Sequence, residues 1–209
     1  MNVVDYIQIN GGNHYRTIPM HRRKNIGVHR ISLAGIHGHG IWDDITPIPD
    51  EKLTGPTLYG HYQIARTGTD RDGNKVQTLG AILGGCPYPF LIPTDGRIHQ
   101  VLPASARTPH AWKRNTDTIA VAIAGNFTIR PPTEAQMETL IPFLALWSAT
   151  GLGVYGHTEM RDATKWVNHE CPGRFLPMAE VRAKVKAHKW ASIEKSKALD
   201  TLEQIGVTF

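Results

Sequence analysis

The apolar run at residues 118–125 (TIAVAIAG) constrains the fold more than any other feature of the sequence. Side chains alternate between the two faces of a strand, so Ile119, Val121 and Ile123 share one face and three alanines share the other. Because both faces are apolar, the run predicts a strand that is buried on both sides. The small alanine face would let a helix approach the sheet closely.

A long helix is predicted shortly after this strand. Thr133-Glu-Ala-Gln136 has the pattern of a capping box, in which the first and fourth residues satisfy each other's backbone amides. Apolar residues then recur at helical spacing, which predicts one face packed on the core. They are Met137, Leu140, Ile141, Leu144 and Trp147. Pro142 is expected to kink the helix, and Gly151 or Gly153 to end it.

A hairpin is predicted upstream of the buried strand. Residues 88–92 and 97–102 flank the turn dipeptide Asp95-Gly96. Three prolines around the first of these segments indicate that it lies at a sheet edge or starts irregularly.

Two further segments have a periodic pattern. Residues 30–40 (RISLAGIHGHG) alternate as a strand does, which places His37 and His39 on one face. Residues 178–205 have the pattern of one or two helices. The candidate buried positions in those helices are Val181, Val185, Ile193, Leu199 and Leu202. Residues 45–85 show no clear period and are interpreted as a long loop region.

The charge balance favours anionic partners. Lys and Arg number 23 against 18 Asp and Glu, a net charge of +5, which would attract nucleic acid, anionic lipid or an acidic cell-wall polymer. The basic cluster at residues 21–24 is interpreted as solvated surface. A second basic cluster, in the predicted C-terminal helices, indicates either an ordinary amphipathic surface or contact with an anionic envelope. It consists of Arg182, Lys184, Lys186 and Lys189.

Several protein classes are disfavoured. No run approaches 18 uninterrupted apolar residues, so no transmembrane helix is expected. The first residues have neither a basic nor an apolar signal region, so no secretory signal is expected. Cys86 and Cys171 could form at most one bridge, which excludes a disulfide-dense scaffold. The 11 histidines are unusual, because imidazole is the commonest metal ligand and a ready acid–base group.

Three places could carry chemistry. His37 lies among glycines in a predicted strand, His157 follows a short predicted strand, and Cys171 lies in a Pro-Gly turn near His169. Two imidazoles and one thiolate with an open fourth position form a known catalytic zinc set, and they suit zinc better than magnesium or calcium. The spacing is not that of a zinc finger, so a structural role for each histidine stays open.

Seven motifs stand in order along the chain. They are IHGHG at 36–40, YPFLIPTDGRI at 88–98, RTPHAW at 107–112, NTDTIAVAIAGNF at 115–127, PTEAQ at 132–136, GHTEM at 156–160 and CPG at 171–173. The order of these motifs resembles that in the zinc-dependent N-acetylmuramoyl-L-alanine amidases of the type 2 amidase and peptidoglycan-recognition-protein family. This family includes phage endolysins. The resemblance covers about residues 30–178.

The resemblance implies a Zn²⁺ site formed by His37, His157 and Cys171. His37 is preferred to His39 because the first histidine of the family's pair is the ligand. His39 is then expected near the substrate.

The resemblance also implies the residues around the metal. Tyr88 falls at a catalytic position beside the metal, and His169 falls where the family has a catalytic Lys or Thr. His169 would stabilise the oxyanion or act as general acid. His110 is expected to contact substrate. Glu159 is either a residue that orients a ligand or an ordinary surface carboxylate.

The implied fold is α/β, a mixed central β-sheet flanked by helices, with the cleft near strand ends. Residues 1–29 are expected to form an N-terminal extension, residues 30–178 the catalytic domain, and residues 179–209 a basic helical segment packed on it. The implied reaction is zinc-dependent hydrolysis of the amide bond between N-acetylmuramic acid and L-alanine in peptidoglycan.

The expected protein is a monomeric endolysin, made in a host cytoplasm and acting on the cell wall. A non-catalytic peptidoglycan-binding module is the alternative. A basic nuclease is less favoured, because no evident carboxylate pair could hold metal for phosphodiester cleavage.

Overall fold

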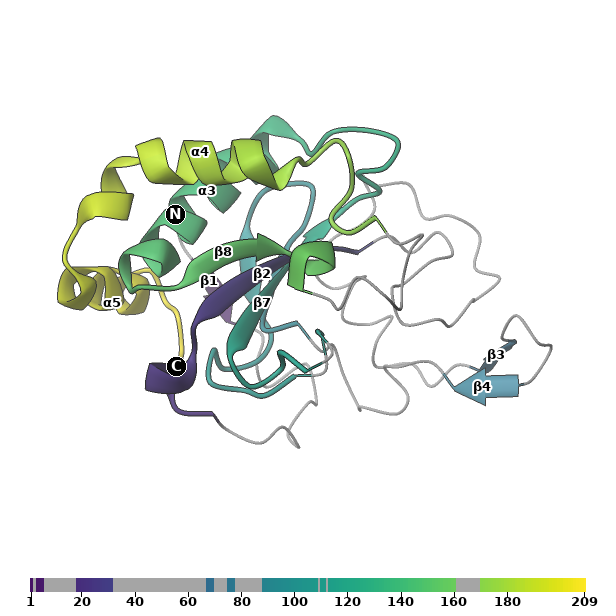
Figure 1. The fold of residues 1–209 in the computed structure, drawn as a ribbon, viewed down its shortest axis with the longest axis horizontal. Helices are drawn as coiled ribbons and strands as arrows, with labels where there is room; N and C mark the ends of the chain where they lie inside the picture. The colour runs from purple at the N-terminus through teal and green to yellow at the C-terminus, as the bar shows by residue number, and fades with distance from the viewer. Residues whose placement is uncertain are drawn as a thin grey trace.

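The computed structural model describes residues 1, 3–5, 18–31, 67–69, 75–77, 88–108, 110–111, 113–160 and 170–209. Its centre is a six-stranded sheet in the order β1-β6-β5-β7-β2-β8 (Figure 1). The strands are β1 (Val3–Asp5), β2 (Asn25–Ile31), β5 (Phe90–Ile92), β6 (Ile98–Gln100), β7 (Thr118–Ala124) and β8 (Gly153–Gly156). Among the described strand pairs of this sheet, β5–β6 is antiparallel and the others are parallel, so the sheet is mixed and the α/β prediction is confirmed. A separate two-stranded sheet contains β3 (Thr67–Thr69) and β4 (Lys75–Gln77).

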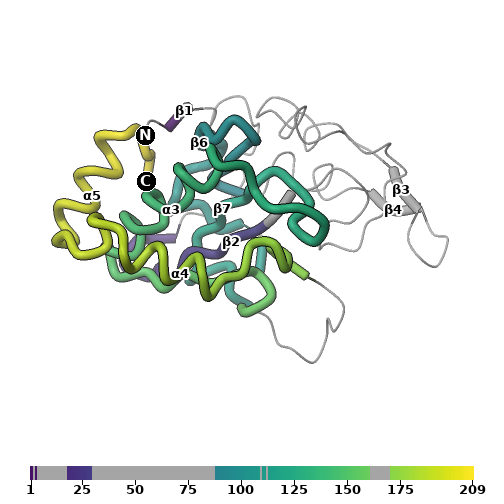
Figure 2. Tube along the Cα trace, turned by 90° about the horizontal axis from the view of Figure 1, so that it is seen from above, coloured from purple at the N-terminus to yellow at the C-terminus, as the bar shows by residue number. Residues whose placement is uncertain are grey.

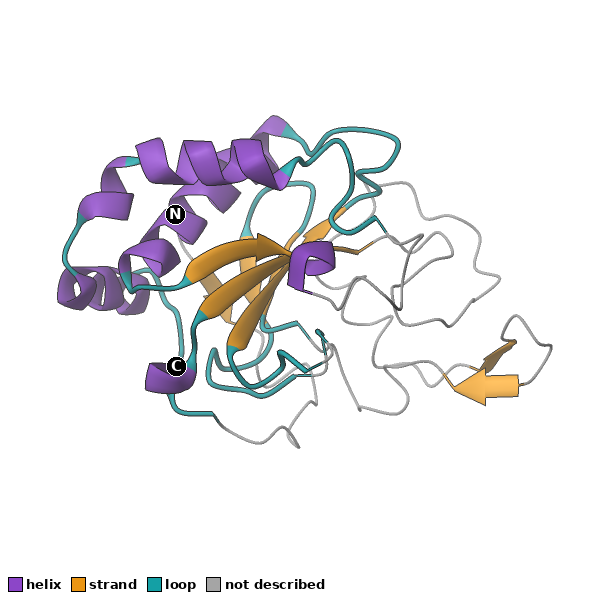
Figure 3. Ribbon diagram, viewed as in Figure 1, coloured by secondary structure: helices purple, strands orange, loops and turns teal. Residues whose placement is uncertain are grey.

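Three α-helices gather on one side of the sheet (Figure 3). They are α3 (Glu134–Ala149), α4 (Met178–Ala187) and α5 (Lys195–Gln204). Three short 3-10 helices accompany them: η1 (Met20–Arg22), η3 (His157–Met160) and η4 (Lys189–Ser192). Seen from above, α3 and α4 lie over β7 and β2 (Figure 2). No helix in the described ranges is long and apolar enough to cross a membrane.

The predicted buried strand is β7, and all seven of its residues are buried. It pairs in parallel with β2 on one side and β5 on the other. The core is built from its isoleucines and valine together with the aromatic side chains of β5 and α3. Trp147 and Phe143 of α3 are fully buried, and the ring of Phe143 lies 5.0 Å from that of Phe90.

The predicted capping box begins α3. The Gln136 amide donates to the Thr133 hydroxyl at 3.1 Å, and the Thr133 amide donates to the Gln136 side chain at 3.0 Å. The buried Gln136 side chain also donates to the carbonyls of Ile92 and Ala124, at 3.2 and 2.8 Å. These bonds fix the start of α3 to the ends of β5 and β7. Gly151, with φ of 97°, follows the helix as predicted.

The predicted hairpin is confirmed as β5 and β6, with the Asp95-Gly96 turn between them. The Gly96 amide donates to the Pro93 carbonyl at 3.0 Å, and its φ of 77° suits glycine. Of the two alternatives for the first strand, an irregular start is correct. β5 begins after Pro89 and lies inside the sheet, where its ladder contains no proline.

The N-terminal boundary differs from the prediction. The described residues of this predicted N-terminal extension contribute β1 and most of β2 to the central sheet, so they belong to the domain. β2 ends at Ile31 and so contains the first two residues of the strand predicted at 30–40, whereas residues 32–40 lie outside the described part of the chain. β2 pairs in parallel with β7 and β8 and has both of its faces covered, because Gly27 and His29 are as buried as Val28 on the opposite face. Such a strand shows no alternation of polar and apolar residues.

The predicted C-terminal helices are confirmed as α4, η4 and α5. Val181, Val185 and Leu202 are buried, whereas Ile193 and Leu199 are partly exposed. The end of the chain returns to its beginning, because the Val3 amide donates to the Ile205 carbonyl at 2.7 Å (Figure 2).

Candidate metal centre

Three buried side chains, His29, His157 and Cys171, converge at one end of the sheet. Their ligand atoms all lie within 4.8 Å of one another, and the rings of the two histidines are 4.4 Å apart. The sheet explains the pairing of the histidines. Val28 of β2 lies opposite Gly156 of β8 in a parallel register. The next residue along each segment is a histidine, His29 within β2 and His157 at the start of η3, so the two histidines lie side by side.

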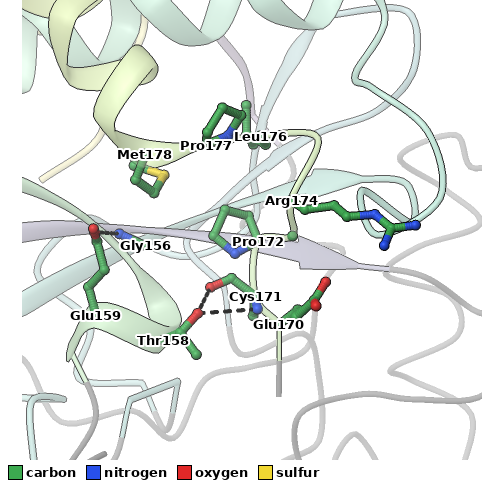
Figure 4. A pocket seen from close by; sticks show the side chains of 11 residues that line it. Gly156, Thr158, Glu159, Glu170, Cys171, Pro172, Arg174, Leu176, Pro177 and Met178 are labelled. Atoms are coloured by element: carbon green, nitrogen blue, oxygen red, sulfur yellow. Dashed lines mark hydrogen bonds between the residues drawn. The ribbon is translucent and has the colours of Figure 1, made fainter. Parts of the chain in front are cut away.

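The loop that carries Cys171 is fixed to η3 through Thr158. The Thr158 backbone amide donates to the Cys171 carbonyl at 3.0 Å, and the Thr158 hydroxyl donates to the same oxygen. The Cys171 amide in turn donates to the Thr158 hydroxyl at 3.2 Å (Figure 4). The sequence analysis did not identify Thr158, and its only signal was its position directly after a candidate ligand.

The turn after Cys171 packs tightly against the segment that follows β7. Gly173 has φ of 123°, and a Cβ there would lie 2.5 Å from the backbone carbon of Phe127. Only glycine fits this position without a shift of the backbone. A cavity of about 310 Å³ opens beside this turn, lined by Cys171, Pro172 and Met178 among others (Figure 4).

Glu159 braces η3 against α4 and does not contact a candidate ligand through a described bond. Its carboxylate accepts from the Gly156 amide at 2.7 Å and from both terminal nitrogens of Arg182, at 2.7 and 3.0 Å. Burial alone would raise the pKa of Glu159, but the bonds from Arg182 and Gly156 outweigh it and hold the pKa below its usual value. Arg182 therefore has an intramolecular partner and is not simply part of a free basic face.

Tyr88 and His110 also contact His29. The Tyr88 ring lies 5.1 Å from that of His29, which places this predicted catalytic residue beside the candidate centre. His110 is only 1% exposed, and its Nδ1 lies 3.2 Å from Nε2 of His29. His110 is therefore buried beside His29, and its predicted contact with substrate stays a prediction.

Arg23 and Asn115 hold the segment that carries His110. The Arg23 guanidinium donates to the carbonyls of Thr118, Ser105 and Ala106 at 2.7–2.8 Å, and to the Asn115 carbonyl at 3.3 Å. Burial lowers the pKa of Arg23 to about 10, with the charge of Asp117 opposing the shift. The prediction that residues 21–24 are solvated surface is therefore wrong for Arg23, which is 5% exposed, although its neighbours on both sides are exposed.

The structure thus brings together two of the three predicted ligands. His157 and Cys171 lie at the centre, and the third member of the cluster is His29, which the sequence analysis did not identify. His37, His39 and His169 lie outside the described residues, so their predicted roles stay predictions.

The donor set fits zinc. Two imidazole nitrogens and one thiolate sulfur suit zinc, whereas magnesium and calcium bind oxygen ligands. Three protein ligands would leave the fourth tetrahedral position to water or substrate, which is typical of catalytic zinc sites.

A family model described as N-acetylmuramoyl-L-alanine amidase matches residues 53–174, more than half of the chain. The matched segment includes His157 and Cys171 but begins after both His29 and His37. No curated protein matches the chain.

Solved structures of amidases and peptidoglycan recognition proteins share the fold. The amidase LysC from Clostridium intestinale URNW is 20% identical, with a TM-score of 0.56, over 90% of this chain and 99% of that one. The Ph2119 endolysin from Thermus scotoductus MAT2119 bacteriophage Ph2119 is 16% identical, with a TM-score of 0.58, over 88% and 99%. A mutant of Drosophila PGRP-LB in complex with tracheal cytotoxin is 14% identical, with a TM-score of 0.50, over 87% and 88%. At these identities, the likeness establishes the fold.

Proposed function

Because the chain belongs to the N-acetylmuramoyl-L-alanine amidase family, we propose that it is a zinc-dependent hydrolase of the amide bond between N-acetylmuramic acid and L-alanine in peptidoglycan. One observation carries this proposal: the buried side chains of His29, His157 and Cys171 converge at one end of the sheet. The proposed ligand set therefore replaces His37 with His29. Membership of the family supports a peptidoglycan substrate, and the His-His-Cys cluster supports hydrolysis of that substrate.

The three ligands have distinct protonation requirements. Zinc, when bound, would supply Lewis-acid polarisation of the scissile carbonyl and activation of water. His29 and His157 would hold the zinc as neutral imidazoles, each with a lone pair on one ring nitrogen, and Cys171 would hold it as a thiolate. The burial of all three excludes bulk water from the donor atoms and strengthens their electrostatic interactions.

Residues around the cluster act on the substrate. Tyr88, packed against His29, donates its phenolic hydrogen to the oxygen of the scissile carbonyl as negative charge develops there. His169 stabilises the same charge or gives a proton to the leaving alanine amine. His39 contacts the substrate.

The alternative is a module that binds peptidoglycan without cutting it. A pure binder has no use for a buried thiol between two imidazoles, and this argument favours the enzyme. The two functions differ in their products, because only the enzyme releases stem peptides from intact glycan.

The decisive experiment combines metal analysis with product analysis. Purified peptidoglycan is incubated with the wild type, with Cys171→Ala and with the control Cys86→Ala, and the products are identified by mass spectrometry. We expect wild type and Cys86→Ala to retain one zinc and release stem peptides, and Cys171→Ala to do neither. Cleavage by Cys171→Ala at the wild-type rate would refute the metal assignment, and intact peptidoglycan after wild-type treatment would favour the binding module.

We also propose that the protein is a phage endolysin that is made in the host cytoplasm and acts on the cell wall as a monomer. The exposed Lys184, Lys186 and Lys189 near the C-terminus give it a basic surface for the anionic envelope. Lysis of host cells that express the wild type together with a membrane-permeabilising agent, and survival of cells that express Cys171→Ala, would support this role. Survival of both would oppose it.

A further inference from the structure

The buried ring of His110 joins His29 to a backbone carbonyl. His110 Nδ1 lies 3.2 Å from His29 Nε2, and His110 Nε2 lies 3.2 Å from the carbonyl oxygen of Thr118. The two rings meet edge to face, 5.2 Å apart at 84°. A neutral imidazole has one donor nitrogen and one acceptor nitrogen, so the direction of one bond fixes the direction of the other.

Only one assignment of hydrogens satisfies this chain of neutral groups. A carbonyl oxygen can only accept, so Nε2 of His110 carries the hydrogen and its Nδ1 is an acceptor. That acceptor requires a hydrogen on Nε2 of His29. The lone pair of His29 is then on Nδ1, which becomes the nitrogen available to a metal.

The surroundings favour a neutral His110. The ring is 1% exposed, and Nη1 of Arg23 donates to the same Thr118 carbonyl at 2.7 Å. A second hydrogen on His110 would place a second cation beside the guanidinium, away from water, which is costly. The backbone is also fixed, because the Asn115 side chain accepts from the amides of His110 and Ala111 at 3.0 and 2.7 Å.

We propose that His110 is a positioning residue that fixes the Nε2–H tautomer of His29 and so presents the Nδ1 lone pair to the metal. The inference rests on the proposed zinc centre and gives His110 a role other than the expected contact with substrate. Partners that hold the second nitrogen of a metal-binding histidine commonly change metal affinity by about 10- to 100-fold.

Two substitutions at position 110 test this role. His110→Leu removes both bonds, whereas His110→Gln keeps an amide oxygen to accept from His29 and an amide nitrogen to donate to Thr118. The control His99→Leu makes the same change at another buried histidine, on β6. By competition titration we expect zinc affinity to fall about 10- to 100-fold in His110→Leu, to recover largely in His110→Gln, and to stay at the wild-type value in His99→Leu.

A second readout does not need the metal. Nitrogen-15 NMR of the metal-free protein distinguishes the two histidine tautomers, with the His29 signals identified by their loss in His29→Gln. We expect the Nε2–H tautomer in wild type and in His110→Gln, and loss of that preference in His110→Leu. An Nδ1–H tautomer in wild type, or unchanged zinc affinity in His110→Leu, would overturn the inference. A wild type that binds no zinc would instead overturn the proposed function.

Discussion

Thr158 holds Cys171 through its backbone amide and its hydroxyl, and the hydroxyl both accepts from the Cys171 amide and donates to the Cys171 carbonyl. These bonds join residues 13 positions apart. They fix the loop that carries the sulfur directly beside the helix turn that begins with His157. The geometry of the cluster therefore depends on a residue that offers no ligand atom of its own.

Thr158→Val should weaken both the fold and the metal site. The substitution keeps the side-chain volume but removes the hydroxyl, which leaves the Cys171 amide without this acceptor. We expect a loss of about 1–3 kcal/mol in the free energy of unfolding and a loss of about tenfold in zinc affinity. Urea unfolding and zinc titration measure the two effects. Thr158→Ser, which keeps the hydroxyl, is the matched control, and equal zinc affinity in the two variants would contradict the prediction.

His29 and His37 can be separated by metal content. His29→Ala should lose the bound zinc, since it removes one of three ligands, whereas His37→Ala should keep it. Both variants are dialysed against buffer without chelator and analysed for zinc, with circular dichroism to check that each is folded. Zinc retained by His29→Ala and lost from His37→Ala would return the first ligand to His37.

Arg23 should be far more important for stability than its neighbour in the sequence. Arg23→Met keeps most of the side-chain volume but deprives four carbonyl oxygens of their donor, three of them in buried hydrogen bonds. We expect a cost of about 3 kcal/mol or more. The exposed Arg22 provides the control, because Arg22→Met should change stability by less than about 0.5 kcal/mol. Similar unfolding midpoints for the two variants would show that the guanidinium contacts contribute little.

The salt bridge between Glu159 and Arg182 should make a small contribution to the free energy of unfolding, and this contribution should be lost in acid. The pKa of Glu159 is lower in the folded protein than its ordinary value of 4.5, so the unfolded state binds the proton more readily. The salt bridge therefore makes its full contribution to stability at neutral pH. This contribution is lost as the pH falls below 4.5 and passes through the pKa of Glu159 in the folded protein. Both side chains are more than a third exposed, so we expect only about 0.3–1 kcal/mol after screening by solvent.

Comparison of the wild type with Glu159→Gln from pH 7 to pH 3 measures this contribution. The difference in unfolding free energy should be largest at neutral pH and shrink below pH 4.5. Glu180→Gln, at an exposed position on α4, should show no such trend. A difference that stays constant across the range would mean that the bridge does not contribute through the charge of Glu159.

The sequence by itself determined the elements that have local signals. The two apolar faces of β7, the capping box of α3 and the Asp-Gly turn of the hairpin each lie within a few neighbouring residues, and each is confirmed. His157 and Cys171 were also identifiable, because each stands in a short motif of the family.

Only the tertiary structure decided the place of β2 in the sheet and the contacts that His29, Arg23 and His110 make. The carbonyl groups that Arg23 binds and the ring of His110 that contacts His29 lie 81 to 95 positions away along the chain. His157 and Cys171 lie farther still from His29. These segments lie beside β2 only in the folded sheet. A strand covered on both faces needs no alternation, and a buried polar group is recognisable only by the distant groups that satisfy it. The sequence spacing of His29, Arg23 and His110 therefore carried no sign of the centre that they help to build.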